Sequence, residues 1–131
     1  MLFLNLFLSL WIFLTPLQKP ELEVHTIDPI IAALGNGSSN DLAKFFDSSI
    51  SLNINGQQGD YSKTQAELVL RDFFKKNPSQ GFSILYQNEN QGSISTYIGE
   101  YLSSPGNFKV FIKVSQTQSA YKIYSLDFVK N

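Results

Sequence analysis

The chain has 131 residues and a mass of 14.8 kDa, which suffices for one domain with a single hydrophobic core. Ten Lys and Arg residues against eleven Asp and Glu residues give a formal net charge of −1, so the sequence lacks the basic surplus that nucleic-acid binding needs. A hydrophobic content of 43% argues against disorder, and the absence of cysteine excludes disulfides, thiolate nucleophiles and Cys-ligated zinc.

The chain begins with an uncharged apolar run. Residues 1–14, MLFLNLFLSLWIFL, are too few to cross a bilayer about 30 Å thick as a helix. The run predicts an export leader over residues 1–20 and a linker at residues 21–26, although no Lys or Arg precedes it and no small-residue cleavage site precedes Pro16. We therefore expect an exported protein that contacts a membrane only where the leader stays attached.

Two short helices are predicted at the start of the domain, which spans residues 27–131. Asp28 can cap the first helix, Pro29 suits its first turn, and Gly35 suits a left-handed exit. A second helix is predicted at residues 40–46, where apolar side chains share one face. The polar loop between the two helices predicts a helical hairpin.

A β-hairpin and a long helix follow. Residues 49–55 alternate between apolar and polar side chains, as in a half-buried strand, and Asn55-Gly56 favours a turn into a short strand at residues 57–61. Ser62 and Gln65 can form a capping box at the start of a helix that runs to about residue 76. The apolar face of this helix consists of Ala66, Val69, Leu70, Phe73 and Phe74.

The remainder of the chain is predicted as four strands joined by short polar loops. The strands are expected at residues 82–87, 93–102, 108–115 and 121–129. Short connections of this kind predict an antiparallel meander, and Gly99 indicates a bulge or kink such as a strongly curved sheet needs. The predicted fold class is α+β, with helices on one face of a bent antiparallel sheet.

Two stretches carry a resemblance to a known family. They are GDYSKTQAELVLRDFFKKNP at residues 59–78 and LAKFF at residues 42–46. With the order of elements, they resemble domain of unknown function 4783, a branch of the nuclear transport factor 2-like superfamily, over residues 27–129. The resemblance implies a cone in which the curved sheet wraps around the helices and leaves a pocket. It also implies an origin in Bacteroidetes, and hence a location in the periplasm or cell envelope.

Some relatives in this superfamily use an Asp or His base and a Tyr or acid donor inside the cone. The only histidine here is His25, in the predicted linker. The carboxylates considered as bases are Asp60, Glu67, Asp72, Glu89, Glu100 and Asp127. Glu100 and Asp127 stand out because they lie in strands rich in Tyr, so that Tyr97 or Tyr101 could act as the donor. A strand carboxylate more commonly faces solvent, and this keeps catalysis as the alternative.

The aromatic residues suggest a binding surface. An antiparallel sheet has two faces and a domain of this size buries one, so some aromatic side chains must line a pocket or cover an interface. The predicted pocket residues are Phe73, Phe74, Tyr86, Tyr97, Phe111 and Tyr124. A homodimer through the sheet face is favoured over pocket lining, and no cofactor or metal site is expected.

Three functions remain open from the sequence. The favoured one is an exported, non-enzymatic binding or interaction module that uses the cone pocket or the sheet face, with a small apolar ligand or a second copy as partner. The alternative is a small-molecule isomerase or dehydratase with Glu100 or Asp127 as base. The third is a structural envelope protein whose pocket is filled by its own side chains.

Overall fold

A computed structural model describes residues 27–89, 93–117 and 120–131 of the chain. The predicted leader, the linker and His25 lie outside the described residues. The elements, in chain order, are α2 (Asp28–Asn36), α3 (Ser39–Ala43), β1 (Phe46–Ile54), β2 (Gln57–Ser62), α4 (Lys63–Lys76), β3 (Ser79–Glu89), β4 (Ile94–Ser103), β5 (Phe108–Thr117) and β6 (Ala120–Lys130).

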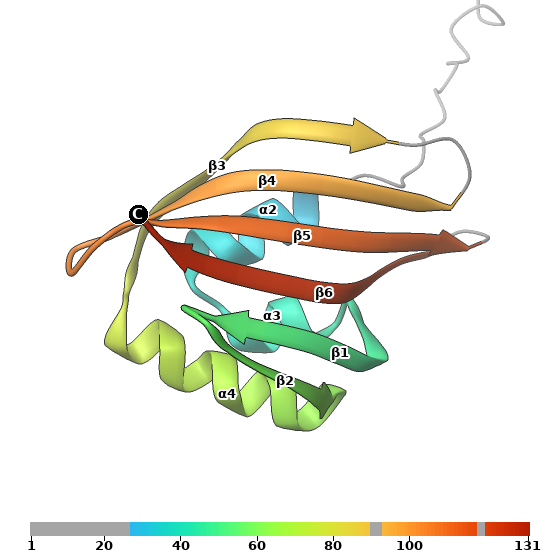
Figure 1. Cartoon of the computed structure of the whole chain (residues 1–131), viewed down its shortest axis with the longest axis horizontal. Coiled ribbons are helices and arrows are strands. Elements are labelled where there is room, and N and C mark those ends of the chain that lie inside the picture. Colours follow the sequence, from blue (N-terminus) through green and yellow to red (C-terminus); the bar gives the residue numbers. More distant parts are fainter. Residues whose placement is uncertain (1–26, 90–92, 118–119) are drawn as a thin grey trace, which may run out of the picture.

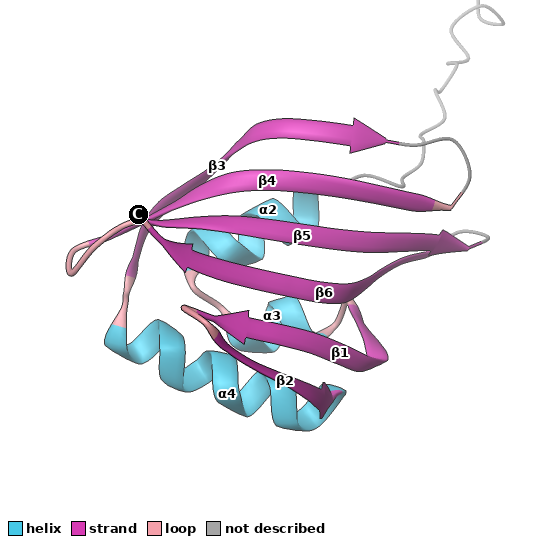
Figure 2. Cartoon of the chain, viewed as in Figure 1, coloured by secondary structure: helices cyan, strands magenta, loops and turns pink. Residues whose placement is uncertain are grey.

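The strands form one curved sheet with the helices on one side of it (Figures 1 and 2). The strand order is β2-β1-β6-β5-β4-β3, so β2 and β3 are the edge strands. All neighbouring strands are antiparallel except β1 and β6, which are parallel. The long connection that a parallel pair needs is supplied by α4 and the four strands that lie between β1 and β6 in the chain. The α+β cone predicted from the sequence is confirmed, with this one departure from an all-antiparallel sheet.

The two short helices form the expected hairpin. The left-handed exit predicted at Gly35 is wrong, because α2 continues to Asn36 and Gly37 ends it with φ of 64°. The Ser38 hydroxyl caps α3 by accepting a hydrogen bond from the Asp41 N–H at 3.1 Å. The prediction of a second helix that reaches residue 46 is wrong, because Phe46 already belongs to β1. Its side chain is buried in the core from the strand, where it pairs with Ile123 of β6.

The long helix α4 begins and ends where the sequence predicts. Ser62 and Gln65 form the capping box, and Lys75 and Lys76 lie in the last turn, where positive charge suits the helix dipole. The apolar face is buried at Ala66, Leu70, Phe73 and Phe74. Among the described residues, no helix has the length and apolar character that crossing a membrane requires.

The irregularity expected at Gly99 is present, but the inserted residue belongs to β3. Ile84 pairs with Gly99 and Tyr86 pairs with Ile98, so Leu85 is the extra residue. A Cβ atom at position 99 would collide with the Phe82 ring, and glycine therefore lets this ring cross β4. As a result, the alternation of faces along β4 itself is unbroken.

Candidate functional site

Aromatic side chains fill the space between α4 and strands β4, β5 and β6. The Phe73 ring lies 4.6 Å from Phe128, 5.1 Å from Phe108 and 5.9 Å from Tyr101, measured between ring centroids. All four rings are at most 5% exposed. This part of the cone is a packed aromatic cluster, as expected for a well-filled core.

The two tyrosines considered as proton donors are buried with their hydroxyls already bonded. Tyr101 donates to the carbonyl oxygen of Asn77 at 2.5 Å, and Tyr97 donates to Oε2 of Glu89 at 2.9 Å. Burial raises the pKa of Tyr101 to about 12, against a smaller lowering by the Ser79 hydroxyl. Burial, followed by the hydrogen bond to Glu89, raises the pKa of Tyr97 even further. Both phenols are therefore neutral at physiological pH.

The two carboxylates considered as bases lie on the opposite, outer face of the sheet. Glu100 is flanked by the buried Gly99 and Tyr101, and its Oε2 accepts a hydrogen bond from Nδ2 of Asn131 at 2.8 Å. Lys109 lies 3.6 Å from the other carboxylate oxygen. Asp127 pairs with Phe111 across β5 and β6, between inward-facing neighbours. Neither carboxylate meets the buried tyrosines, so the predicted pairing of Glu100 or Asp127 with Tyr97 or Tyr101 is not assembled.

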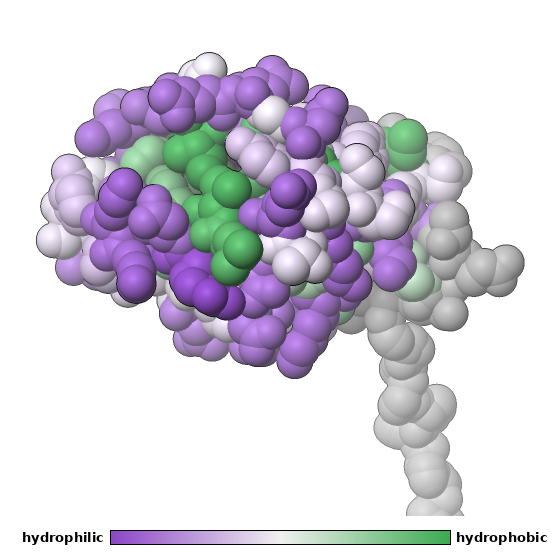
Figure 3. Space-filling model, turned by 90° about the horizontal axis from the view of Figure 1, so that it is seen from below, coloured by the Kyte–Doolittle hydropathy of each residue, from purple (hydrophilic) through white to green (hydrophobic). Residues whose placement is uncertain are grey.

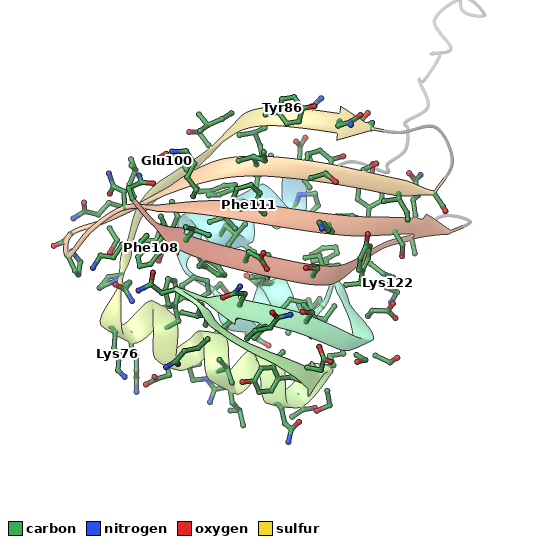
Figure 4. All side chains as sticks on the ribbon, viewed as in Figure 1. Lys76, Tyr86, Glu100, Phe108, Phe111 and Lys122 are labelled. Carbon is green, nitrogen blue, oxygen red and sulfur yellow. The ribbon has the colours of Figure 1, made fainter. Side chains whose placement is uncertain are left out.

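The six predicted pocket residues are divided between the two faces. Phe73, Phe74 and Tyr97 are buried on the concave side. Tyr86 and Phe111 lie on the outer face, on β3 and β5 with β4 between them (Figure 4). Tyr124 is half-buried at a register shift between β5 and β6. Within the described residues, no group of His, Asp and Glu side chains could hold a metal ion.

A cavity of about 330 Å³ lies elsewhere, between the β1–β2 hairpin and α4. We call it the hairpin groove. It is lined by Leu52, Ile54, Asn55, Gln57, Tyr61, Val69, Asp72, Phe73, Lys76 and Asn77. Figure 3, which looks at the side of the molecule that carries β2 and α4, shows a hydrophobic stripe bordered by hydrophilic side chains.

The groove exists because β2 has little to fill it with. The residues of β2 that pair with the inward-facing Ile54, Leu52 and Ile50 are Gln57, Gly59 and Tyr61. The Tyr61 ring lies flat along the strand over Gly59, where an added Cβ would come within 2.9 Å of the Tyr61 hydroxyl oxygen. Without a branched apolar side chain on this strand, the space opposite Val69 stays open.

The rim of the groove is polar but has no net charge. Asp72 and Lys76 form an ion pair at 3.2 Å, one turn apart on α4. Nδ2 of Asn77 donates to the carbonyl oxygen of Phe73 at 3.1 Å. The side-chain amides of Asn55 and Gln57 make no hydrogen bond within the described part of the chain. Both amides are therefore available to a ligand, each as donor and as acceptor.

The sequence patterns that predict the fold do not reveal the groove. They place Asp72 among the possible bases and Val69 on the apolar face of the long helix, and they give Asn55 and Gln57 no role beyond the turn and the short strand that follows it. A usable signal was present: the six residues of β2, QQGDYS, contain one large side chain with apolar surface, although the strand must cover part of α4.

The profile of the family described as Domain of unknown function (DUF4783) matches residues 27–129. A similar solved structure is a DUF4783 family protein from Bacteroides ovatus, with 27% identity, a TM-score of 0.77, and coverage of 82% of this chain and 96% of that chain. A second, from Bacteroides uniformis, has 24% identity and a TM-score of 0.75 over 79% of this chain and 95% of that one. These sources fit the predicted origin in Bacteroidetes.

More distant structures share the fold alone. An NTF-2 like protein of unknown function from Silicibacter pomeroyi has 17% identity and a TM-score of 0.61, over 80% of this chain and 89% of that chain. A de novo designed protein with a curved β-sheet reaches a TM-score of 0.66 at 11% identity, over 79% of this chain and 94% of that one. No curated protein matches the sequence. A designed protein can adopt the same cone, so the fold alone does not indicate a function. The function has to be inferred from the side chains of the candidate site.

Proposed function

Because this chain belongs to the Domain of unknown function (DUF4783) family, whose description names no activity, we propose its function from the groove: the domain is a non-enzymatic module that binds an apolar ligand there. The observation that carries this proposal is the open cavity of about 330 Å³, with an apolar floor and, at its rim, two side-chain amides that form no hydrogen bond with the described residues. Binding sites for small ligands combine these features. The apolar run at residues 1–14 supports export of this module to the periplasm or cell envelope.

Two further observations favour binding over catalysis. General acid–base chemistry needs a base and a donor within hydrogen-bond reach of one reacting group. Glu100 and Asp127 lie on the outer face, whereas Tyr97 and Tyr101 are buried inside and bonded to protein acceptors. In the groove, the carboxylate of Asp72 is already paired with Lys76.

The test is binding of an uncharged apolar fluorophore, N-phenyl-1-naphthylamine, to the full chain. We expect Val69→Trp to fill the groove and reduce fluorescence enhancement at least tenfold, since Val69 lines the cavity. Leu68→Trp is the matched control, because its side chain is 51% exposed on the same helix and does not line the groove. Equal binding by both variants would contradict the proposal.

A second proposal concerns the outer face of the sheet, which suits a homodimer. Tyr86, Ile98 and Phe111 form a row across β3, β4 and β5. On the same face, the exposed side chains Ile94, Leu102 and Val129 extend the apolar surface. A face of this kind supports isologous pairing of two copies.

Light scattering measures the mass in solution and tests this second proposal. We expect a dimer that Phe111→Glu converts to a monomer, because the substitution puts a charge in the middle of the apolar row. Leu68→Glu places the same charge on exposed helix surface and should leave the dimer intact. A wild-type monomer at all concentrations would rule out the dimer and leave the groove proposal unaffected.

A further inference from the structure

We propose that the ligand of the hairpin groove is a peptide segment in extended conformation, which pairs with the free edge of β2 and places alternate apolar side chains in the groove. This inference rests on the proposed function and names the class of ligand. It follows from the edge strand, the lining of the groove and its charge.

The edge of β2 offers unpaired backbone groups. Among the residues that the structure describes, β2 is the last strand of the sheet and pairs with β1 alone. Asn55 and Gly56 have φ of 52° and 95°, typical of a two-residue hairpin turn in which the flanking Ile54 and Gln57 form a hydrogen-bonded pair. Because such pairs alternate along the ladder, Gln58 and Asp60 direct their N–H and C=O groups away from β1. Both residues are exposed.

The length of the available edge is limited at both ends. At one end is the Asn55-Gly56 turn, and at the other the N–H of Ser62 donates to Oε1 of Gln65 in the capping box. Six residues of strand correspond to about 20 Å at roughly 3.3 Å per residue. A segment of about six residues can therefore add here, with every second side chain directed toward the groove.

The charge of the groove favours a neutral group that can both donate and accept hydrogen bonds. The lining residues include one negative and one positive side chain, Asp72 and Lys76, and these neutralise each other. No surplus charge is left to hold an ionic ligand. A peptide backbone with apolar side chains is neutral and complements the free amides of Asn55 and Gln57.

The protein-side test uses an array of heptapeptides with Phe, Leu, Ile or Val at alternate positions and Ser or Thr between them. We expect members of this array to bind the full chain, with affinity measured by fluorescence polarisation on labelled peptides. Asp60→Pro removes an N–H that faces away from β1 and should weaken binding at least tenfold. Asp60→Ala removes the same carboxylate, keeps the N–H, and should bind as the wild type does.

The peptide-side test does not depend on folding of a variant. The best binder is remade with N-methyl groups on alternate residues, in both registers, and one register should lose at least tenfold in affinity. If both methylated peptides bind as well as the parent, or if N-acetylphenylalanine amide competes as well as the peptide does, the strand-addition inference is wrong. Binding of N-phenyl-1-naphthylamine that Val69→Trp abolishes would then still support the groove as a site for small ligands.

Discussion

Helix α4 packs against two parts of the same sheet with different results. Toward β4, β5 and β6, Phe73 and Phe74 meet Tyr101, Phe108 and Phe128, and all five side chains are buried. Toward β1 and β2, the same helix presents Val69 to a strand that offers Gln, Gly and Tyr, and a cavity remains. In both regions the same helix packs against the same sheet. The side chains of the short edge strand β2 therefore determine whether a cavity remains.

The difference also separates a region that stabilises the fold from the proposed binding site. The aromatic cluster buries large rings with their polar atoms satisfied, and it contributes to folding without leaving room for a ligand. The groove leaves apolar surface unburied, which costs the free protein some stability, whereas the side-chain amides of Asn55 and Gln57 are exposed to water. Substitutions in the two regions should therefore have different effects, and three experiments compare them.

The largest effect is expected from Phe128→Ala in the aromatic cluster. Phe128 is fully buried and contacts four other rings, so its truncation leaves a large cavity and should lower the free energy of unfolding by about 3–5 kcal/mol. Leu68→Ala, at a position of α4 that is 51% exposed, should change it by about 0.5 kcal/mol or less. Urea denaturation followed by circular dichroism measures both, and a loss below about 1 kcal/mol for Phe128→Ala would mean that the cluster is loosely packed.

Much of this fold could be predicted from the sequence because hydrophobic periodicity, helix caps and turn residues are local signals. The capping box at Ser62, the Asn55-Gly56 turn and the four final strands all lie where the pattern placed them. The prediction that the second helix reaches residue 46 was wrong because a buried Phe fits the apolar face of a helix as well as that of a strand. Pairing of Phe46 with Ile123 of β6 places it in a strand. Tertiary context settled what the local pattern left ambiguous.

The site was less accessible, since it depends on which face each strand residue occupies. Glu100 is an odd number of residues from both Tyr97 and Tyr101, so in an unbroken strand it must face the other way. The glycine at position 99 suggested a break in β4, but the extra residue is Leu85 of β3 and the alternation in β4 continues. The groove arises because the inward-facing positions of β2 carry no branched apolar side chain. Hydrophobic periodicity predicts a strand but does not show whether its side chains fill the space beside it.

The same substitution in both regions gives a direct comparison. Val110→Phe adds a ring at a fully buried position of β5 that pairs with Gly99 and Phe128, and this overpacking should cost about 1–3 kcal/mol. Val69→Phe adds the ring to the groove, where the cavity has room for it, and should change stability by about 0.5 kcal/mol or less. Equal losses from the two variants would show that the groove is not open in solution.

The smallest effect is expected from Tyr101→Phe, and its size depends on pH. At pH 7 the variant loses the hydrogen bond to the Asn77 carbonyl and should be about 1 kcal/mol less stable, whereas Tyr61→Phe in the groove should change stability by less than half of that. Because burial raises the folded-state pKa of Tyr101 to about 12 from 10 in the unfolded chain, the stability that its neutral form contributes is complete below pH 10 and is lost between pH 10 and 12. The wild type should therefore lose stability more steeply than Tyr101→Phe in that interval, and the difference between them should shrink. Urea denaturation midpoints of both proteins at pH 7, 10 and 11.5 measure this difference. If the difference in midpoint is the same at all three pH values, the Tyr101 phenol is as accessible to solvent as the side chains of the groove.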